Sequence, residues 1–138
     1  SITTGPSHAS YANYKGTSAL SEPESKALAD LANSANWTMT ISYHSMGNLV
    51  YWDFAGNKVA EQSKALADLV TGITGYRINR SSGKGGFKDY VQIKDSPIPS
   101  LTIEVGSVAC PMPVSEFGNV WNSNQSILAA LAAYAADH

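Results

Sequence analysis

A histidine and a glutamate occupy matching places in two apolar segments of the chain. His44 directly follows the alternating segment W-T-M-T-I-S-Y and has the parity of its polar residues, and Glu104 lies inside S-L-T-I-E-V-G. An ionised carboxylate in so apolar a segment is costly unless a cation, a metal ion or a proton compensates it. The two residue types together point to proton transfer or metal binding. The alternatives are that His44 is a hydrogen-bonded surface histidine and that Glu104 is paired with a nearby Lys or Arg.

Both segments are predicted strands. Residues 37–43 alternate apolar and polar side chains, and residues 100–106 place Leu101, Ile103 and Val105 on one side. If the two strands belong to one sheet, His44 and Glu104 lean over the same edge, where open α/β sheets bind their ligands.

The remaining segments alternate between helix and strand, which predicts the α/β class. A short strand is expected at residues 49–54. Helices are expected at residues 21–35 with Ser21 as N-cap, at 57–73 ending before Gly75, and at about 115–136 with Trp121, Leu128 and Leu131 inward. Residues 1–20 and 76–95 read as irregular.

Composition indicates a single soluble domain over residues 1–138. The chain is 43% hydrophobic and 14% charged, with a formal net charge of -2, so it lacks the basic surface that nucleic-acid binding needs. No apolar run is long enough for a membrane span, and the N-terminus lacks the features of a signal peptide. We therefore expect neither a nucleic-acid nor a membrane partner.

Four motifs in this order resemble the C-terminal half of the zinc carboxypeptidases of the carboxypeptidase A type. They are H-S-M-G-N-L-V-Y-W, G-G-F-K-D-Y, S-L-T-I-E-V-G and P-V-S-E-F-G-N-V-W. The resemblance is strongest to the bacterial branch that includes γ-D-glutamyl-diamino acid peptidases, which act on cell-wall peptides. It implies a mixed sheet with helices packed on it, a Zn²⁺ cofactor, a peptide or peptidoglycan-peptide substrate, and a secreted or cell-envelope location.

The resemblance also implies roles for four residues. His44 takes the place of the second histidine ligand of zinc, and Glu104 that of the general base, which takes a proton from the attacking water and returns it to the leaving amine. Ser45 would contact substrate, and Lys88 would lie at the base of the pocket for the side chain after the scissile bond. A cation there favours a carboxylate. The alternative for Lys88 is a solvated loop lysine.

The chain departs from the family pattern in its metal ligands. It contains no His-x-x-Glu, and neither Arg77 nor Arg80 matches the arginines that bind the substrate carboxylate in the family. We therefore interpret the chain as the C-terminal part of a longer peptidase. Alone it should bind zinc weakly, lack peptidase activity and self-associate through surface that truncation exposes.

Three other hypotheses are weighed against this one. A non-catalytic module that keeps the fold and binds peptides without a metal is the main alternative. The glycine-rich S-S-G-K-G-G lacks the spacing of a phosphate loop. Cys110 could suggest a thiol hydrolase, but a small buried thiol is the better interpretation.

Overall fold

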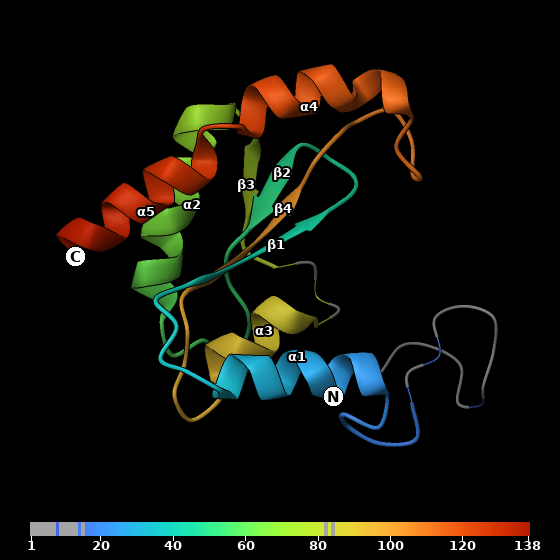
Figure 1. Cartoon of the computed structure of the whole chain (residues 1–138), viewed down its shortest axis with the longest axis vertical. Coiled ribbons are helices and arrows are strands. Elements are labelled where there is room, and N and C mark those ends of the chain that lie inside the picture. Colours follow the sequence, from blue (N-terminus) through green and yellow to red (C-terminus); the bar gives the residue numbers. More distant parts are fainter. Residues whose placement is uncertain (1–7, 9–13, 15, 82, 84) are drawn as a thin grey trace.

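Four short strands form one mixed sheet at the centre of the structure (Figure 1). The computed structural model describes residues 8, 14, 16–81, 83 and 85–138. The strands are β1 (Thr40–His44), β2 (Leu49–Tyr51), β3 (Arg77–Asn79) and β4 (Ser100–Glu104), in the spatial order β1-β4-β2-β3. β4 is parallel to β1 and antiparallel to β2, and β2 is parallel to β3.

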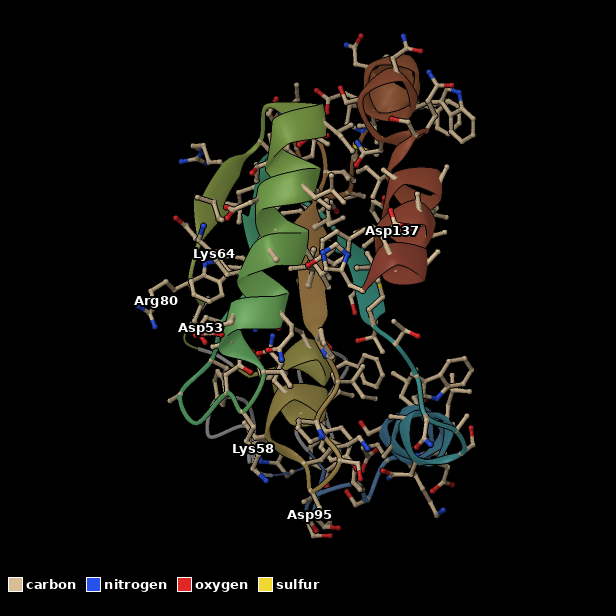
Figure 2. The ribbon with its side chains drawn as sticks, turned by 90° about the vertical axis from the view of Figure 1, so that its left-hand side faces the viewer. Asp53, Lys58, Lys64, Arg80, Asp95 and Asp137 are labelled. Carbon is tan, nitrogen blue, oxygen red and sulfur yellow. The ribbon has the colours of Figure 1, made fainter. Side chains whose placement is uncertain are left out.

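Helices surround the sheet on one face and at its two ends. They are α1 (Pro23–Asn33), α2 (Ala60–Thr74), α3 (Phe87–Ile93), α4 (Phe117–Asn124) and α5 (Ile127–Asp137), with a 3₁₀ turn η1 (Val114–Glu116) before α4. In Figure 2, α2 and α5 lie side by side in front of the sheet, while in Figure 1 α1 and α3 lie below it. This arrangement confirms the predicted α/β class with helices packed on a mixed sheet. Among the described residues, no helix is both long and apolar enough to cross a bilayer.

The main core lies between the sheet and the pair α2 and α5. Alternation along the strands turns Val50 of β2 and Leu101 and Ile103 of β4 toward these helices, whereas Leu49 lies on the opposite face with Glu104. The buried cluster consists of Val50, Leu66, Ala67, Val70, Leu101, Ile103, Val105, Ile127 and Leu131. On the opposite face, Ser42, Thr102 and Glu104 are only half-buried. The apolar side of β4 is thus fixed by packing, and its polar side is free for other contacts.

The prediction that residues 76–95 form a loop is wrong over two stretches. The structure has strand β3 there, and helix α3 follows it. β3 has a single apolar residue, Ile78, so no alternation was visible. α3 buries Lys88, Asp89 and Gln92 along with Val91. Helices are predicted from apolar residues at helical spacing, and a buried face made mainly of charged and polar residues does not show that pattern.

The predicted C-terminal helix is two helices, α4 and α5. The break falls at Gln125 and Ser126, the end of the polar run N-S-N-Q-S, consistent with the weak helix propensity of Asn and Ser. Leu131 is buried as expected at 2% exposure, but Trp121 and Leu128 are 54% and 64% exposed. These two residues therefore do not face the core of the described structure.

The other elements match their predictions except at their ends. α2 stops at Gly75, which adopts the left-handed conformation typical of a C-cap glycine. α1 has Glu22 rather than Ser21 at its N-cap, because the Ser21 hydroxyl accepts the Thr17 amide N–H instead. The prediction for residues 1–20 lies largely outside the described residues.

An ion pair between buried Asp53 and exposed Arg80 links the segments just beyond β2 and β3. The Asp53 carboxylate is 6% exposed and accepts hydrogen bonds from Arg80 Nε at 3.0 Å and Asn57 Nδ2 at 3.1 Å; Figure 2 shows Asp53 beside Arg80. Burial raises the pKa of Asp53, but the hydrogen bonds from Arg80 and Asn57 outweigh it and hold the pKa below its ordinary value. The ionised form is therefore the one that the fold stabilises.

Leu131 and Leu128 provide a matched pair for testing the core. Leu131→Ala should lower the free energy of unfolding by about 2–5 kcal/mol because it opens a cavity between α2, α5 and the sheet. Leu128→Ala, in the same helix, should change it by less than about 0.5 kcal/mol. Urea unfolding measures both; equal effects would place the core elsewhere.

Asp53→Asn tests the ion pair between Asp53 and Arg80. A carboxyl whose folded pKa is lowered stabilises the fold above its unfolded pKa and loses that contribution as pH falls through the folded value. At pH 7 the variant should be about 1–3 kcal/mol less stable than wild type, and this gap should close as pH falls from about 5 to 2. Asp30→Asn, at an exposed pair with Lys26, is the control and should show little change. A gap that does not depend on pH would contradict the account.

Candidate functional site

His44 and Glu104 meet at the carboxyl ends of two adjacent parallel strands. They are register partners in the ladder between β1 and β4, so their side chains project from the same face of the sheet. His44 Nδ1 lies 3.2 Å from Glu104 Oε2. The structure therefore brings together the two residues that sequence parity singled out.

Burial differs sharply between the two side chains. The Glu104 side chain is only 15% exposed, whereas that of His44 is 70% exposed. The imidazole is open to solvent and to a ligand, and the carboxylate lies beneath it against the sheet. A carboxylate that is partly withdrawn from water and hydrogen-bonded to an imidazole is well placed to accept and release a proton.

The loop after His44 is held tightly against the end of β4. The Gly47 N–H donates to Gly106 O at 2.7 Å, and the Val105 N–H donates to His44 O at 2.8 Å. Gly106 has φ +74, and a Cβ there would come within 2.5 Å of Met112 Sδ. The positive φ therefore favours glycine where the chain turns after Glu104.

Ser45 and Cys110 lie together beside this loop. Ser45 Oγ is 3.7 Å from Cys110 Sγ, and the Cys110 side chain is exposed. The prediction of a small buried thiol is therefore wrong. Ser45 directly follows the exposed His44, and its contact with substrate stays a prediction.

The described residues alone do not make a catalytic zinc site. No group of three or more His, Cys, Asp or Glu side chains is gathered closely enough among them to hold a metal ion. His44 and Glu104 offer one imidazole and one carboxylate, whereas a catalytic zinc takes three protein ligands and a water. The exposed imidazole of His44 is suited to be one ligand of such a site. The other ligands are not assigned among the described residues.

Lys88 is buried in α3, which excludes the alternative of a solvated loop lysine. It is 4% exposed; its ammonium donates to Asp53 O at 2.9 Å and pairs with the Asp89 carboxylate. α3 contacts the amino end of β4 through the bond from Gln92 Nε2 to Ser100 O at 2.9 Å, and Glu104 is at the other end of that strand. The structure does not bring Lys88 to the His44–Glu104 pair, and its substrate role stays a prediction.

An open cavity of about 450 Å³ lies at the Asp53–Arg80 ion pair, and neither His44 nor Glu104 lines it. It is lined by Asp53, Arg80, Ser81, Ala60 and the turn at residues 54–57. Asp53 and Arg80 neutralise each other on its wall. The contact between His44 and Glu104 is therefore separate from this cavity.

Sequence reasoning missed Arg77. It is the register partner of Leu49, which in turn pairs with Glu104, and its Nη2 donates to Gly47 O at 3.1 Å. Arg77 lies in β3, a stretch predicted to be a loop, so no alternation pointed to its side of the sheet. The only available signal was an arginine two residues after Gly75, which is too weak to interpret.

Comparison with known proteins identifies the family of this chain. The model of the zinc carboxypeptidase family matches residues 3–126. The chain is 32% identical over 119 residues to the gamma-D-glutamyl-L-diamino acid endopeptidase 1 of Lysinibacillus sphaericus, covering 86% of this chain and 30% of that protein. It is 26% identical over 125 residues to the uncharacterized protein YqgT of Bacillus subtilis (strain 168), covering 89% of this chain and 33% of that protein.

These matches extend over almost the whole of this chain, which spans about a third of the length of the curated relatives. They include the strand ends that carry the paired imidazole and carboxylate. The chain belongs to the zinc carboxypeptidase family.

Proposed function

We propose that this chain is part of the catalytic domain of a zinc-dependent peptidase and supplies its general base and one of its metal ligands. The observation that carries the proposal is the 3.2 Å contact between His44 Nδ1 and Glu104 Oε2 at the ends of adjacent parallel strands. Membership of the zinc carboxypeptidase family supports it.

Glu104 would act as the base in peptide-bond hydrolysis. Its carboxylate takes a proton from water as the water oxygen bonds to the scissile carbonyl carbon, and it passes that proton to the amine nitrogen as the carbon–nitrogen bond breaks. The low exposure of its side chain, 15%, and its place on a buried strand keep the carboxylate in a fixed position. Zinc, when bound, supplies a Lewis acid that polarises the carbonyl and lowers the pKa of water.

His44 would hold the metal together with ligands from polypeptide outside these 138 residues. The chain has no His-x-x-Glu, and the described residues lack a three-ligand group. The isolated chain is then inactive and prone to self-association through apolar residues that α4 exposes, Phe117 and Trp121. We further propose that the complete protein acts at the cell envelope or outside the cell.

The name of one relative supports a proposal for the substrate class. One relative is a gamma-D-glutamyl-L-diamino acid endopeptidase, so we propose peptides of that cell-wall type as substrates. Ser45 would contact the substrate backbone beside His44, and Lys88 would set the preference for an acidic side chain.

A second candidate is a peptide-binding module that keeps the fold without the metal. The incomplete ligand set among the described residues favours it. The two candidates differ in whether the protein, expressed with the coding sequence upstream of Ser1, contains zinc.

Glu104→Gln tests the base. In the protein expressed with its upstream coding sequence, the amide removes the proton acceptor, so kcat should fall by about 10²–10⁴-fold with zinc content unchanged. Glu24→Gln, an exposed site in α1, is the matched control and should be active. Full activity in Glu104→Gln, or loss in both variants, would refute the assignment.

His44→Ala tests the metal ligand. The same longer protein should lose most of its bound zinc, because a three-ligand site deprived of one imidazole binds zinc weakly. His138→Ala, at the exposed C-terminus, should retain one equivalent. The 138-residue chain alone should show no tight site by zinc titration; stoichiometric binding with turnover would contradict the proposal, and a longer protein without zinc would favour the binding module.

A further inference from the structure

The residue row that contains His44 and Glu104 continues across the sheet to Arg77. Glu104 pairs with Leu49 of β2, and Leu49 pairs with Arg77 of β3. Register partners project from the same face of a sheet, so Arg77 shares the face and the edge of the His44–Glu104 pair. It stands two strands from Glu104, or about 10 Å at the usual strand spacing.

Arg77 is bonded to the loop at residues 45–48, which joins His44 to β2. Its Nη2 donates to Gly47 O at 3.1 Å, and its backbone N–H donates to Asn48 O at 3.0 Å. On the other side, the Gly47 N–H donates to Gly106 O at 2.7 Å. The two peptide groups of Gly47 are thus held by β3 and by the segment after β4.

Gly47 lies directly against the base. A Cβ on Gly47 would be 4.0 Å from Glu104 Cβ and 2.9 Å from Leu49 Cδ2, and its φ is +154. The loop therefore closes over the row in a conformation that favours glycine. Because it starts at the residue after His44, a shift of the loop moves the imidazole relative to the carboxylate.

We propose that Arg77 is a positioning residue: by holding the Gly47 carbonyl, it fixes the loop that sets the relation of His44 to Glu104. This role rests on the proposed function of that pair. Among the described residues Arg77 forms no ion pair, in contrast to Arg80, whose guanidinium pairs with Asp53. A guanidinium bond to a backbone carbonyl is charge-assisted and directional, which suits it to fixing a loop.

Arg77→Met, Arg77→Lys and Arg80→Met form the test set. In the zinc-containing protein, Arg77→Met should lower kcat by about 10-fold with KM within about 2-fold, since misplaced catalytic groups slow chemistry more than binding. Arg77→Lys should recover most of the loss, because an ammonium also donates to the Gly47 carbonyl. Arg80→Met should keep kcat although it breaks the Asp53 pair.

Amide hydrogen exchange of Gly47 provides a reading without substrate. Arg77→Met should speed it by about 10-fold by loosening the loop, and Arg80→Met should not. Unchanged exchange in Arg77→Met would overturn the proposal, as would faster exchange with unchanged kcat. A rise in KM confined to acidic substrates would also overturn it and make Arg77 a substrate ligand. Activity of Glu104→Gln would refute the proposed function alone. The amide exchange of Gly47 tests separately whether Arg77 holds the loop at residues 45–48.

Discussion

The contact between His44 and Glu104 depends on the parallel pairing of β1 and β4. Parallel register places both side chains at one edge and on one face. The two side chains therefore contact each other without any displacement of the backbone. A shift of one residue in either strand would turn one of the two side chains to the opposite face, where α2 and α5 pack. The hydrophobic pattern that fixes the register is therefore also what assembles the candidate site.

Packing on one face of the sheet explains how an acidic group is held near the protein interior. Leu101 and Ile103 are fully buried against α2 and α5, which anchors β4 from behind. The Glu104 side chain leaves the same strand on the other face, where its carboxylate lies within hydrogen-bond distance of the His44 imidazole. Gly106 turns the chain two residues after Glu104, and its carbonyl accepts the Gly47 N–H, which holds Gly47 beside Glu104. The position of Glu104 is thus fixed by backbone contacts of neighbouring residues, which do not involve its own side chain.

Sequence reasoning found His44 and Glu104 because strand parity is a strong local signal. Alternation over residues 37–43 and 100–106 predicted the strands and the side of each polar residue. It failed for β3 because three residues are too few to show alternation. It failed for α3 because the buried side of that helix carries the charged residues Lys88 and Asp89 where apolar residues are expected. The partner of a buried charge is set by tertiary packing, so the Lys88 environment and the Arg77 contact were visible only in the structure. Trp121 and Leu128 show the same limit, since helical spacing does not say what covers a face.

The most direct test of the central claim is the position of zinc in a crystal of the protein expressed with its upstream coding sequence. Anomalous scattering at the zinc edge should place one metal ion about 2.0–2.1 Å from a ring nitrogen of His44, with the Glu104 carboxylate on the same side of the sheet and not among the three protein ligands. A zinc ion bound away from His44, or a Glu104 turned toward α2 and α5, would contradict the account.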